Sequence, residues 1–317
     1  MVHLSTKKIK GRDYLYAVKS IRLPGGAVAT LDKLVKGKAD LASPEVSAFF
    51  DRKEAELFAR FYKAHCYPFK LRGEDALEKI ELMRVEYKKI LAKLSPNQLQ
   101  DLFDRFTVNF TYESNALEGN SLTLKDVAII VHERVAIKGK DLREVYDARN
   151  ARNVIDLILK RKFKVNERDV LKMHAMLVRD TGVPIGYKTV PNYLQGRQLL
   201  TTPPEEVKKE FGKLFAWFEL NRKKMHPLQL AAKFHANFER IHPFEDGNGR
   251  VGRFLINVIL VNSGYPPFII RKTQRLSYFN ALEDADNSRF QTIEQLFFER
   301  LKETHEKFFK IYVKYLK

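Results

Sequence analysis

The sequence predicts a mainly α-helical protein with a β-hairpin near its N-terminus. Residues 74–94, EDALEKIELMRVEYKKILAKL, repeat apolar side chains at helical spacing, and residues 254–267, FLINVILVNSGYPP, begin as an apolar run typical of a buried helix. The 317 residues are 44% hydrophobic and 12% aromatic, which is enough for a substantial core. A chain of this length fits two domains, or one large helical domain with an extension.

The N-terminal region is predicted to form a hairpin followed by helices. Residues 13–33 combine β-branched and aromatic residues around a Pro24-Gly25-Gly26 turn, which is a hairpin pattern. Ser43 is a candidate N-cap, with Pro44 at the first helical position. The helix that follows repeats four apolar residues at helical spacing, namely Leu57, Phe58, Phe61 and Tyr62.

The second amphipathic helix ends at Ser95-Pro96, where a third helix should begin. We place a domain boundary there, with an N-terminal extension over residues 1–95 and a second domain over residues 96–317. Residues 1–95 contain no pattern that suggests catalysis, and the chain has no internal repeat.

Cysteine content and hydropathy indicate the cellular compartment. The single cysteine, Cys66, excludes an internal disulfide framework and fits a reducing compartment. No apolar run approaches the ~18 residues needed to span a membrane, and the N-terminal residues lack the apolar stretch of a secretory signal. We therefore expect a cytoplasmic protein with no membrane partner.

The formal net charge of +18 fits either a polyanionic partner or a lysine-rich solvated surface. Basic residues are spread from KKIKGR near the start to KYLK at the end, and no single arm concentrates them. We favour the solvated surface and do not expect a nucleic-acid partner. A positive field would also attract a nucleotide triphosphate.

The segment 242–253, HPFEDGNGRVGR, contains the parts of a phosphate-handling site. His242 supplies a nitrogen that titrates near neutral pH, and Asp246 supplies a hard oxygen for a metal such as Mg²⁺. Gly247, Asn248 and Gly249 allow backbone N–H groups to curl around an anion.

Arg250 and Arg253 follow this loop three residues apart, so on a helix they share a face and can hold phosphate oxygens. The loop precedes the apolar helix, and helix N-termini bind anions. Together these residues predict a site for a phosphate-bearing ligand.

The segment resembles the Fic motif HPFx(D/E)GNGRxxR at every fixed position, and the chain is similar to Fic-domain protein adenylyltransferases over roughly residues 105–305. The resemblance implies a Fic-type helical bundle with a β-hairpin flap. It also implies ATP as substrate with Mg²⁺, His242 as general base, Asp246 as metal ligand, and nucleotide binding by residues 247–250 and Arg253. Arg250 would hold the β-phosphate region and Arg253 the γ-phosphate.

Residues 111–119, TYESNALEG, form a second motif. Ser114 and Glu118 are four residues apart, so a helix places them on one face, and Gly119 can end it. The same pattern fits an ordinary amphipathic helix with a glycine cap. It also resembles the (S/T)xxxE(G/N) inhibitory helix of Fic proteins, which implies an ion pair between Glu118 and Arg253 that keeps the γ-phosphate away.

Residues 186–200, GYKTVPNYLQGRQLL, read as a hairpin around Gln195-Gly196. By resemblance this hairpin is the flap, which orients a target segment by strand-like backbone pairing. The flap residues would be Thr189, Val190, Tyr193 and Leu194. A structural hairpin without a partner is the alternative, in which Lys188 and Tyr193 face solvent.

Three further features allow two interpretations each. His235 precedes the motif by about two helical turns and is expected to be a core residue or a support of the site, with a ligand as the alternative. Tyr278 lies where the family often places an aromatic residue near adenine, but helix packing explains it equally well. The terminal helix carries an apolar stripe that is either buried or a homodimer face, formed by Phe297, Leu301, Phe308 and Tyr312.

The resemblance implies a protein adenylyltransferase that moves AMP from ATP to a Ser, Thr or Tyr hydroxyl of a target protein, or of itself, and that Glu118 inhibits. Two alternatives remain open. The chain could remove AMP from a modified protein, with Glu118 positioning water. It could also be a basic nucleic-acid or partner-binding protein without catalysis.

Overall fold

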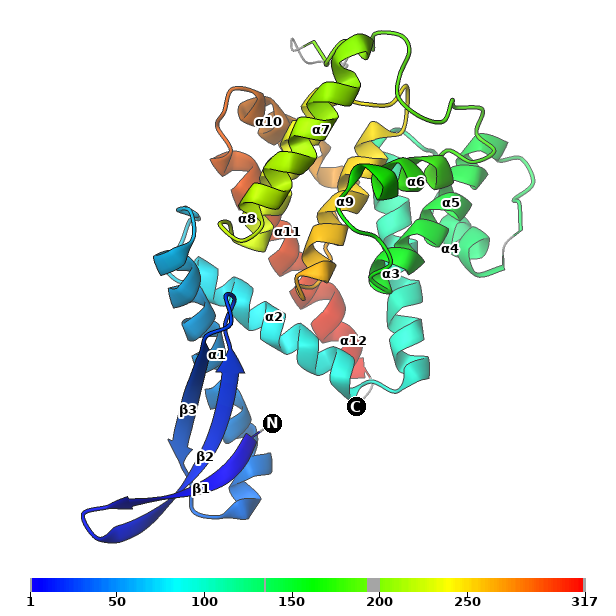
Figure 1. The fold of residues 1–317 in the computed structure, drawn as a ribbon. Coiled ribbons are helices and arrows are strands. Elements are labelled where there is room, and N and C mark those ends of the chain that lie inside the picture. The colour runs from blue at the N-terminus through cyan, green and yellow to red at the C-terminus, as the bar shows by residue number, and fades with distance from the viewer. Residues whose placement is uncertain (1, 134, 193–199, 316–317) are drawn as a thin grey trace.

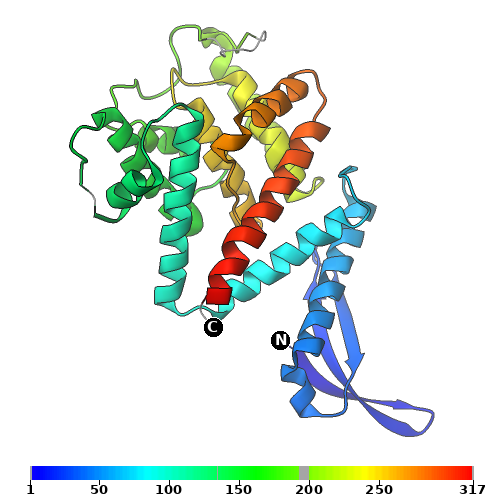
Figure 2. The same cartoon turned by 180° about the vertical axis from the view of Figure 1, so that it is seen from behind.

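The computed structural model describes residues 2–133, 135–192 and 200–315, and it is mainly helical with one small β-sheet at the N-terminus (Figure 1). The predicted fold class is therefore confirmed. The sheet and the first helix project from the main helical body, and α2 leads from them into it (Figures 1 and 2).

Three antiparallel strands form the sheet in the order β1-β2-β3. They are β1 (Val2–Ile9), β2 (Arg12–Arg22) and β3 (Val28–Leu34). The predicted hairpin is β2–β3, and its turn uses positive φ values of 91° at Gly25 and 95° at Gly26. Strand β1 was not predicted, because its lysine-rich sequence resembles a solvated segment.

Helix α1 (Pro44–His65) begins as predicted at Ser43, whose hydroxyl accepts a hydrogen bond from the backbone N–H of Val46 at 3.2 Å. It covers one face of the sheet, where Ala17 and Phe50 are buried together (Figures 1 and 2). Helix α2 (Ala76–Lys93) follows within two residues of the predicted range.

Ser95 separates α2 from α3 (Pro96–Leu117) and caps α3 together with Gln98. Helix α2 nevertheless contributes Ile80 and Tyr87 to the main core. The domain boundary at residue 95 stays a prediction.

The helices that follow build the body around the antiparallel pair α8 (Pro227–Ile241) and α9 (Asn248–Asn262). Helices α3, α5 and α6 pack beside α9, and α10 and α11 pack beside α8 (Figure 1). The remaining bounds are α4 (Leu124–Glu133), α5 (Leu142–Leu159), α6 (Glu167–Leu177), α7 (Pro204–Asn221), α10 (Arg275–Asp286), α11 (Gln291–Thr304) and α12 (Lys310–Tyr315).

The terminal apolar stripe mostly packs inward. Phe297 and Leu301 are fully buried in the main core, while Phe308 and Tyr312 are partly buried against it. Phe297 and Leu301 therefore cannot form a homodimer face in this conformation. None of the described helices combines the length and apolar character required to cross a bilayer.

A buried charge network joins the N-terminal helices to the body. The Glu81 carboxylate accepts hydrogen bonds from Arg84 at 2.7 Å and from the Tyr265 hydroxyl at 2.5 Å, and it lies 2.9 Å from His226 Nε2. Arg84 also contacts Glu54 of α1 at 3.3 Å. Burial opposes the charge on Glu81, but these partners outweigh it and hold the pKa of Glu81 below its usual value.

Candidate active site

The site lies where α8 ends and α9 begins. His242 ends α8 in a left-handed conformation with φ of 50°, and Gly247 precedes α9 with φ of 83°. The turn between them is short, and α8 and α9 pack closely at Gly252. A Cβ there would overlap the Glu239 carboxylate and approach the His235 ring to 2.8 Å.

His242 is mostly enclosed, with a side chain 16% exposed. Its Nδ1 lies 3.3 Å from the backbone carbonyl of Glu239 and 3.8 Å from Oε2 of the same residue. A proton on Nδ1 would satisfy the carbonyl and leave the lone pair on Nε2. Glu239 is buried at 4% exposure and was not predicted as a site residue.

Two polar side chains brace the loop of residues 243–247. The Asn248 amide accepts from Phe244 N at 2.9 Å and donates to Phe244 O at 2.7 Å. In this conformation the Asn248 side chain therefore holds the loop closed, so the nucleotide binding predicted for this residue is left to its backbone N–H. His174 lies beneath the loop, with Nε2 3.0 Å from Asp246 O and its ring stacked on Phe244 at 3.8 Å.

Burial lowers the pKa of His174 to about 4, so the ring is neutral near pH 7 and can donate from Nε2 to the Asp246 carbonyl. We assigned this histidine no role from the sequence. Its position on α6 (Glu167–Leu177) becomes evident only when α6 packs beside α9.

The Asp246 side chain is 48% exposed and forms an ion pair with Arg143 of α5. One of its oxygens also accepts from Gly247 N at 2.5 Å. Across the described ranges, no group of three or more His, Cys, Asp or Glu side chains is arranged to hold a metal ion. Asp246 alone still fits Mg²⁺ carried by a nucleotide, because that ion needs one or two carboxylates besides phosphate and water.

Arg250 is 4% exposed and forms an ion pair with Asp147, one helical turn after Arg143 on α5. Burial raises the pKa of Asp147, although Arg250 opposes that rise. Arg143 and Asp147, four residues apart on α5, thus each form an ion pair with the motif. No sequence pattern distinguished these two residues.

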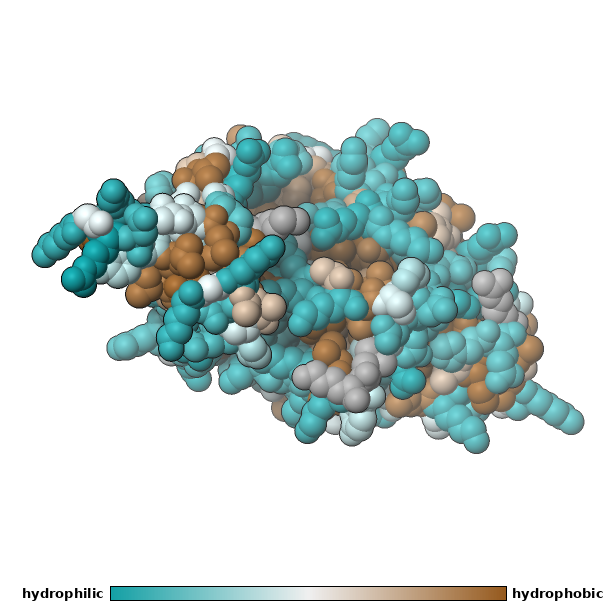
Figure 3. Space-filling view, turned by 90° about the horizontal axis from the view of Figure 1, so that it is seen from below, coloured by the Kyte–Doolittle hydropathy of each residue, from teal (hydrophilic) through white to brown (hydrophobic). Residues whose placement is uncertain are grey.

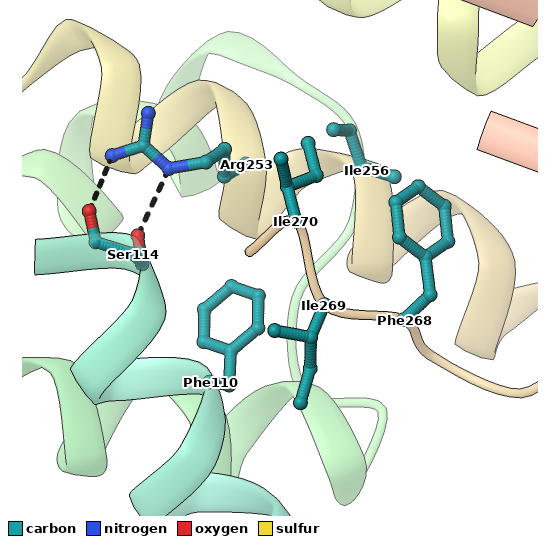
Figure 4. A pocket seen from close by; sticks show the side chains of 7 residues that line it. All are labelled: Phe110, Ser114, Arg253, Ile256, Phe268, Ile269 and Ile270. Carbon is teal, nitrogen blue, oxygen red and sulfur yellow. Dashed lines mark hydrogen bonds between the residues drawn. The ribbon is translucent and has the colours of Figure 1, made fainter. Parts of the chain in front are cut away.

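Arg253 is 3% exposed and is held by the end of α3. Its Nε donates to Ser114 Oγ at 3.0 Å, and its Nη2 donates to Ser114 O at 2.9 Å and to Glu118 Oε1 at 2.7 Å. Figure 4 shows the guanidinium above Ser114, with Phe110 and Ile269 on the apolar side. Burial would lower the pKa of Arg253, but the Glu118 carboxylate outweighs burial and raises it.

Glu118 also lies over the glycine loop. A Cβ at Gly249 would overlap Glu118 Oε1 and approach Arg253 Nη1 to 2.9 Å. Gly119 then ends the turn with φ of 92°. The Glu118 side chain is 44% exposed, so it closes the loop from the solvent side.

The segment predicted as a flap is tied to the motif, but much of it lies outside the described residues, including Tyr193 and Leu194. Lys188 N donates to Pro243 O at 2.9 Å, and Thr189 Oγ1 donates to Glu245 Oε1 at 2.8 Å. Residues 187–192 form no strand, and Val190 is 57% exposed.

Lys188 does not face solvent. The interpretation that placed it there, as part of a structural hairpin without a partner, is therefore wrong for this residue. Lys188 is 2% exposed and donates to Asn192 Oδ1 at 2.8 Å and to Thr201 Oγ1 at 2.9 Å. Burial lowers the pKa of Lys188 to about 8.

Tyr278 is 1% exposed, and its hydroxyl lies 2.7 Å from His235 Nε2. The structure therefore shows the packing interpretation, and an adenine cannot contact this ring unless the surroundings move. Burial raises the pKa of Tyr278 far above its usual value. His235 is fully buried, as expected of a core residue.

Part of the chain is similar to known proteins. Residues 164–260 match the model of the Fic/DOC family. The chain is 30% identical over 179 residues to proteins named protein adenylyltransferase Fic, including those of Drosophila melanogaster and Drosophila sechellia. That alignment covers 55% of this chain and 36% of the relative, so the chain spans about a third of the length of these relatives.

Solved structures show the same fold. A Fic-domain-containing signaling protein from Bacteroides thetaiotaomicron aligns with a TM-score of 0.68 and 24% identity, over 74% of this chain and 97% of that one. A Fic family protein from Desulfovibrio desulfuricans aligns with a TM-score of 0.61 and 25% identity, over 76% of each chain.

The fold and the site define a helical protein with a glycine-rich loop at a helix N-terminus. Residues 164–260 match the Fic/DOC family, and the recognition made from the motif is confirmed. Helix α3, with Ser114 and Glu118, precedes the segment that the family model matches.

Proposed function

We propose that the protein transfers AMP from ATP to a Ser, Thr or Tyr hydroxyl of a target protein, and that Glu118 restrains this activity. The relatives named protein adenylyltransferase support the reaction class. The observation that carries the proposal is the cluster of His242, the glycine loop and two buried arginines at one helix start.

His242 acts as general base in this proposal. The target hydroxyl loses its proton to Nε2, its oxygen attacks the α-phosphorus, and the bond to the bridging oxygen of pyrophosphate breaks. The Glu239 carboxylate, 3.8 Å from Nδ1, stabilises the imidazolium that forms. AMP ends on the hydroxyl and pyrophosphate leaves.

The phosphates bind the loop and the arginines. Backbone N–H groups of residues 247–249 face the anion at the α9 N-terminus, where the helix dipole favours negative charge. Arg250, held by Asp147, faces the β-phosphate region, and Arg253 faces the γ-phosphate. Positioning and charge neutralisation then supply most of the rate.

Asp246 would hold Mg²⁺, whose charge would offset that of the phosphates. Its carboxylate is half-exposed at the loop and already faces one cation, Arg143, so the position suits positive charge. Arg143 must give way, at least in part, when the metal–nucleotide complex binds.

Glu118 restrains transfer because it occupies both Arg253 and the space over Gly249. A carboxylate there repels an anionic phosphate and removes the donors that the γ-phosphate needs. The bound nucleotide would then place its α-phosphorus wrongly for attack.

The segment around Thr189 and Val190 would align the target by backbone pairing, because its described residues are hydrogen-bonded to the motif but form no strand of their own.

Labelled ATP tests this function directly. Wild type, Glu118→Gly and the double variant Glu118→Gly/His242→Ala are incubated with Mg²⁺, α-labelled ATP and a cell lysate, and protein-bound label is measured, self-modification included. We expect label with Glu118→Gly and a loss of ~10²–10⁴-fold in the double variant, which is the usual effect of removing a general base. Equal labelling by both variants would show that His242 is not the general base.

A second reaction shares the same site. Glu118 is half-exposed beside the loop, so it could also position water for removal of AMP from a modified protein. Incubation with an AMP-modified protein separates the two reactions. Release of AMP by wild type and its loss in Glu118→Gly would assign hydrolysis in place of restraint.

A further inference from the structure

The N-terminal sheet has one face that no described element covers. Helix α1 lies on one face, and Figures 1 and 2 show none of the described helices on the other. The strand register assigns the residues of this outer face, because directly paired residues point to the same side. Tyr14 pairs with Lys7, and Tyr16 pairs with Ser5 on β1 and Leu34 on β3.

The outer face carries aromatic and aliphatic side chains that remain in contact with solvent. Tyr14 is 36% exposed, and the Tyr16 ring lies 4.6 Å from Lys7 Nζ. Ile9 and Leu34 are 44% and 55% exposed beside them. An aromatic row on a solvent-facing sheet is a surface on which flat rings can stack.

The same region carries an excess of positive charge, within a chain whose basic residues are spread along its length. Residues 1–38 contain nine Lys or Arg against two Asp. Lys8, Lys10 and Arg12 are exposed at the tip of the β1–β2 hairpin. Figure 3 shows hydrophilic side chains at this tip with an apolar patch beside them.

We propose that this outer face of the sheet, with Tyr14 and Tyr16 at its centre and Lys10 and Arg12 at the hairpin tip, binds single-stranded RNA or DNA. Bases stack on the tyrosines, and the backbone phosphates meet the cations at the hairpin tip. A duplex hides its base faces and would leave the aromatic row unused. The inference is independent of nucleotide transfer, because the face lies outside the body that contains His242.

Fluorescence anisotropy with a labelled 20-nucleotide single strand tests the proposal on the full chain. We expect binding that weakens as salt rises, with a slope of about 0.7 per phosphate neutralised. Tyr14→Ala should weaken binding by about five- to 150-fold, the usual range for loss of one stacked base, whereas Tyr14→Phe keeps the ring and should bind like wild type. Arg12→Glu should weaken binding and reduce the salt slope.

Controls separate the sheet from general charge. Lys208→Glu/Lys209→Glu removes exposed cations from α7 and should leave binding unchanged, and His242→Ala should bind like wild type. Tyr14 is a third exposed, so folding should survive its replacement, and circular dichroism checks this. Absence of binding at low salt, or binding unaffected by Tyr14→Ala and Arg12→Glu, would overturn the proposal.

Three other results would overturn it in favour of another occupant. Equal affinity for a duplex of the same length, with no effect of Tyr14→Ala, would indicate purely electrostatic binding. Sedimentation showing a dimer that Tyr14→Ala dissociates would assign the face to a second copy of the chain. Capture by anionic phosphatidylserine vesicles but not by a single strand would assign it to a membrane surface.

Discussion

Arg253 and Glu118 meet across the glycine loop, with Nη2 and Oε1 2.7 Å apart although the residues are 135 positions apart in the sequence. The arginine is 3% exposed and the glutamate side chain 44%. The pair is thus buried on its cationic side and accessible on its anionic side, so a competing anion can approach from solvent. A γ-phosphate is such an anion.

Replacing Glu118 by Gly should raise AMP transfer and slightly lower the free energy of unfolding. The change leaves the buried Arg253 without the carboxylate that pairs with it at 2.7 Å, and ATP can restore the missing anion. Thermal unfolding should therefore show a lower midpoint without ATP and recovery with it. Asp101→Asn, which removes an exposed pair from the same helix, is the control. A Glu118→Gly protein no faster than wild type would refute the restraint.

Replacing Arg253 should weaken ATP more than AMP. The comparison is cleanest in the Glu118→Gly background, where Arg253 is available to the nucleotide. A charged hydrogen-bond partner is worth about 1.5–3 kcal/mol, so Arg253→Ala should weaken ATP by roughly ten- to 150-fold and AMP by much less. Isothermal titration calorimetry with both nucleotides measures this. Equal weakening would mean that the arginine does not reach the γ-phosphate.

Replacing Arg143 should change the Mg²⁺ requirement of transfer. Arg143 pairs with Asp246 from an exposed position on α5, so it competes with a metal for the carboxylate. In the Glu118→Gly background, Arg143→Gln should lower the Mg²⁺ concentration for half-maximal rate, whereas Asp246→Ala should abolish the Mg²⁺-dependent rate. A rate titration against Mg²⁺ tests both. A higher Mg²⁺ requirement in Arg143→Gln would show that the arginine supports the metal–nucleotide complex instead.

Local patterns predicted the helix starts at Ser43 and Ser95, the β2–β3 hairpin and the motif turn, because capping and turn chemistry depend on adjacent residues. They did not predict Asp147, Arg143 or His174, because these residues join the site only through helix packing. Tyr278 shows the reverse case, since its position in the chain suggested a ligand contact but packing buries its ring against His235.

Removing one charge from the buried network that joins α2 to the body should lower the free energy of unfolding more than removing both charges of a pair. Arg84→Met removes a charge partner of the Glu81 carboxylate and should destabilise the fold by about 3–5 kcal/mol. The double change Glu81→Leu/Arg84→Met should recover part of that loss, because it removes both charges. Urea unfolding of the single and double variants measures the coupling. Additive losses would show that the two side chains act independently.

The free energy of unfolding should decrease as pH falls from about 6.5 to 4, because of His174. Its pKa is lowered to about 4 in the folded protein, so in this window the unfolded chain binds the extra proton and unfolding becomes easier as pH falls. The loss of stability due to His174 reaches about 3 kcal/mol near pH 4 and is absent above pH 7. Glu294, whose pKa is raised to about 7, has the opposite dependence, since its stabilising proton is lost as pH rises.

A variant comparison isolates the histidine, because Glu294 is common to both proteins. His174→Phe keeps a ring against Phe244 but cannot titrate, so it should lack the part of the pH dependence that His174 supplies. It also loses the hydrogen bond to the Asp246 carbonyl and should be less stable than wild type at pH 7. The stability advantage of wild type should therefore shrink as pH falls from 6.5 and reverse before pH 4, because the loss of about 3 kcal/mol exceeds the roughly 0.5–1.5 kcal/mol of one hydrogen bond. A constant difference across that range would mean that His174 does not titrate with the low pKa its burial implies.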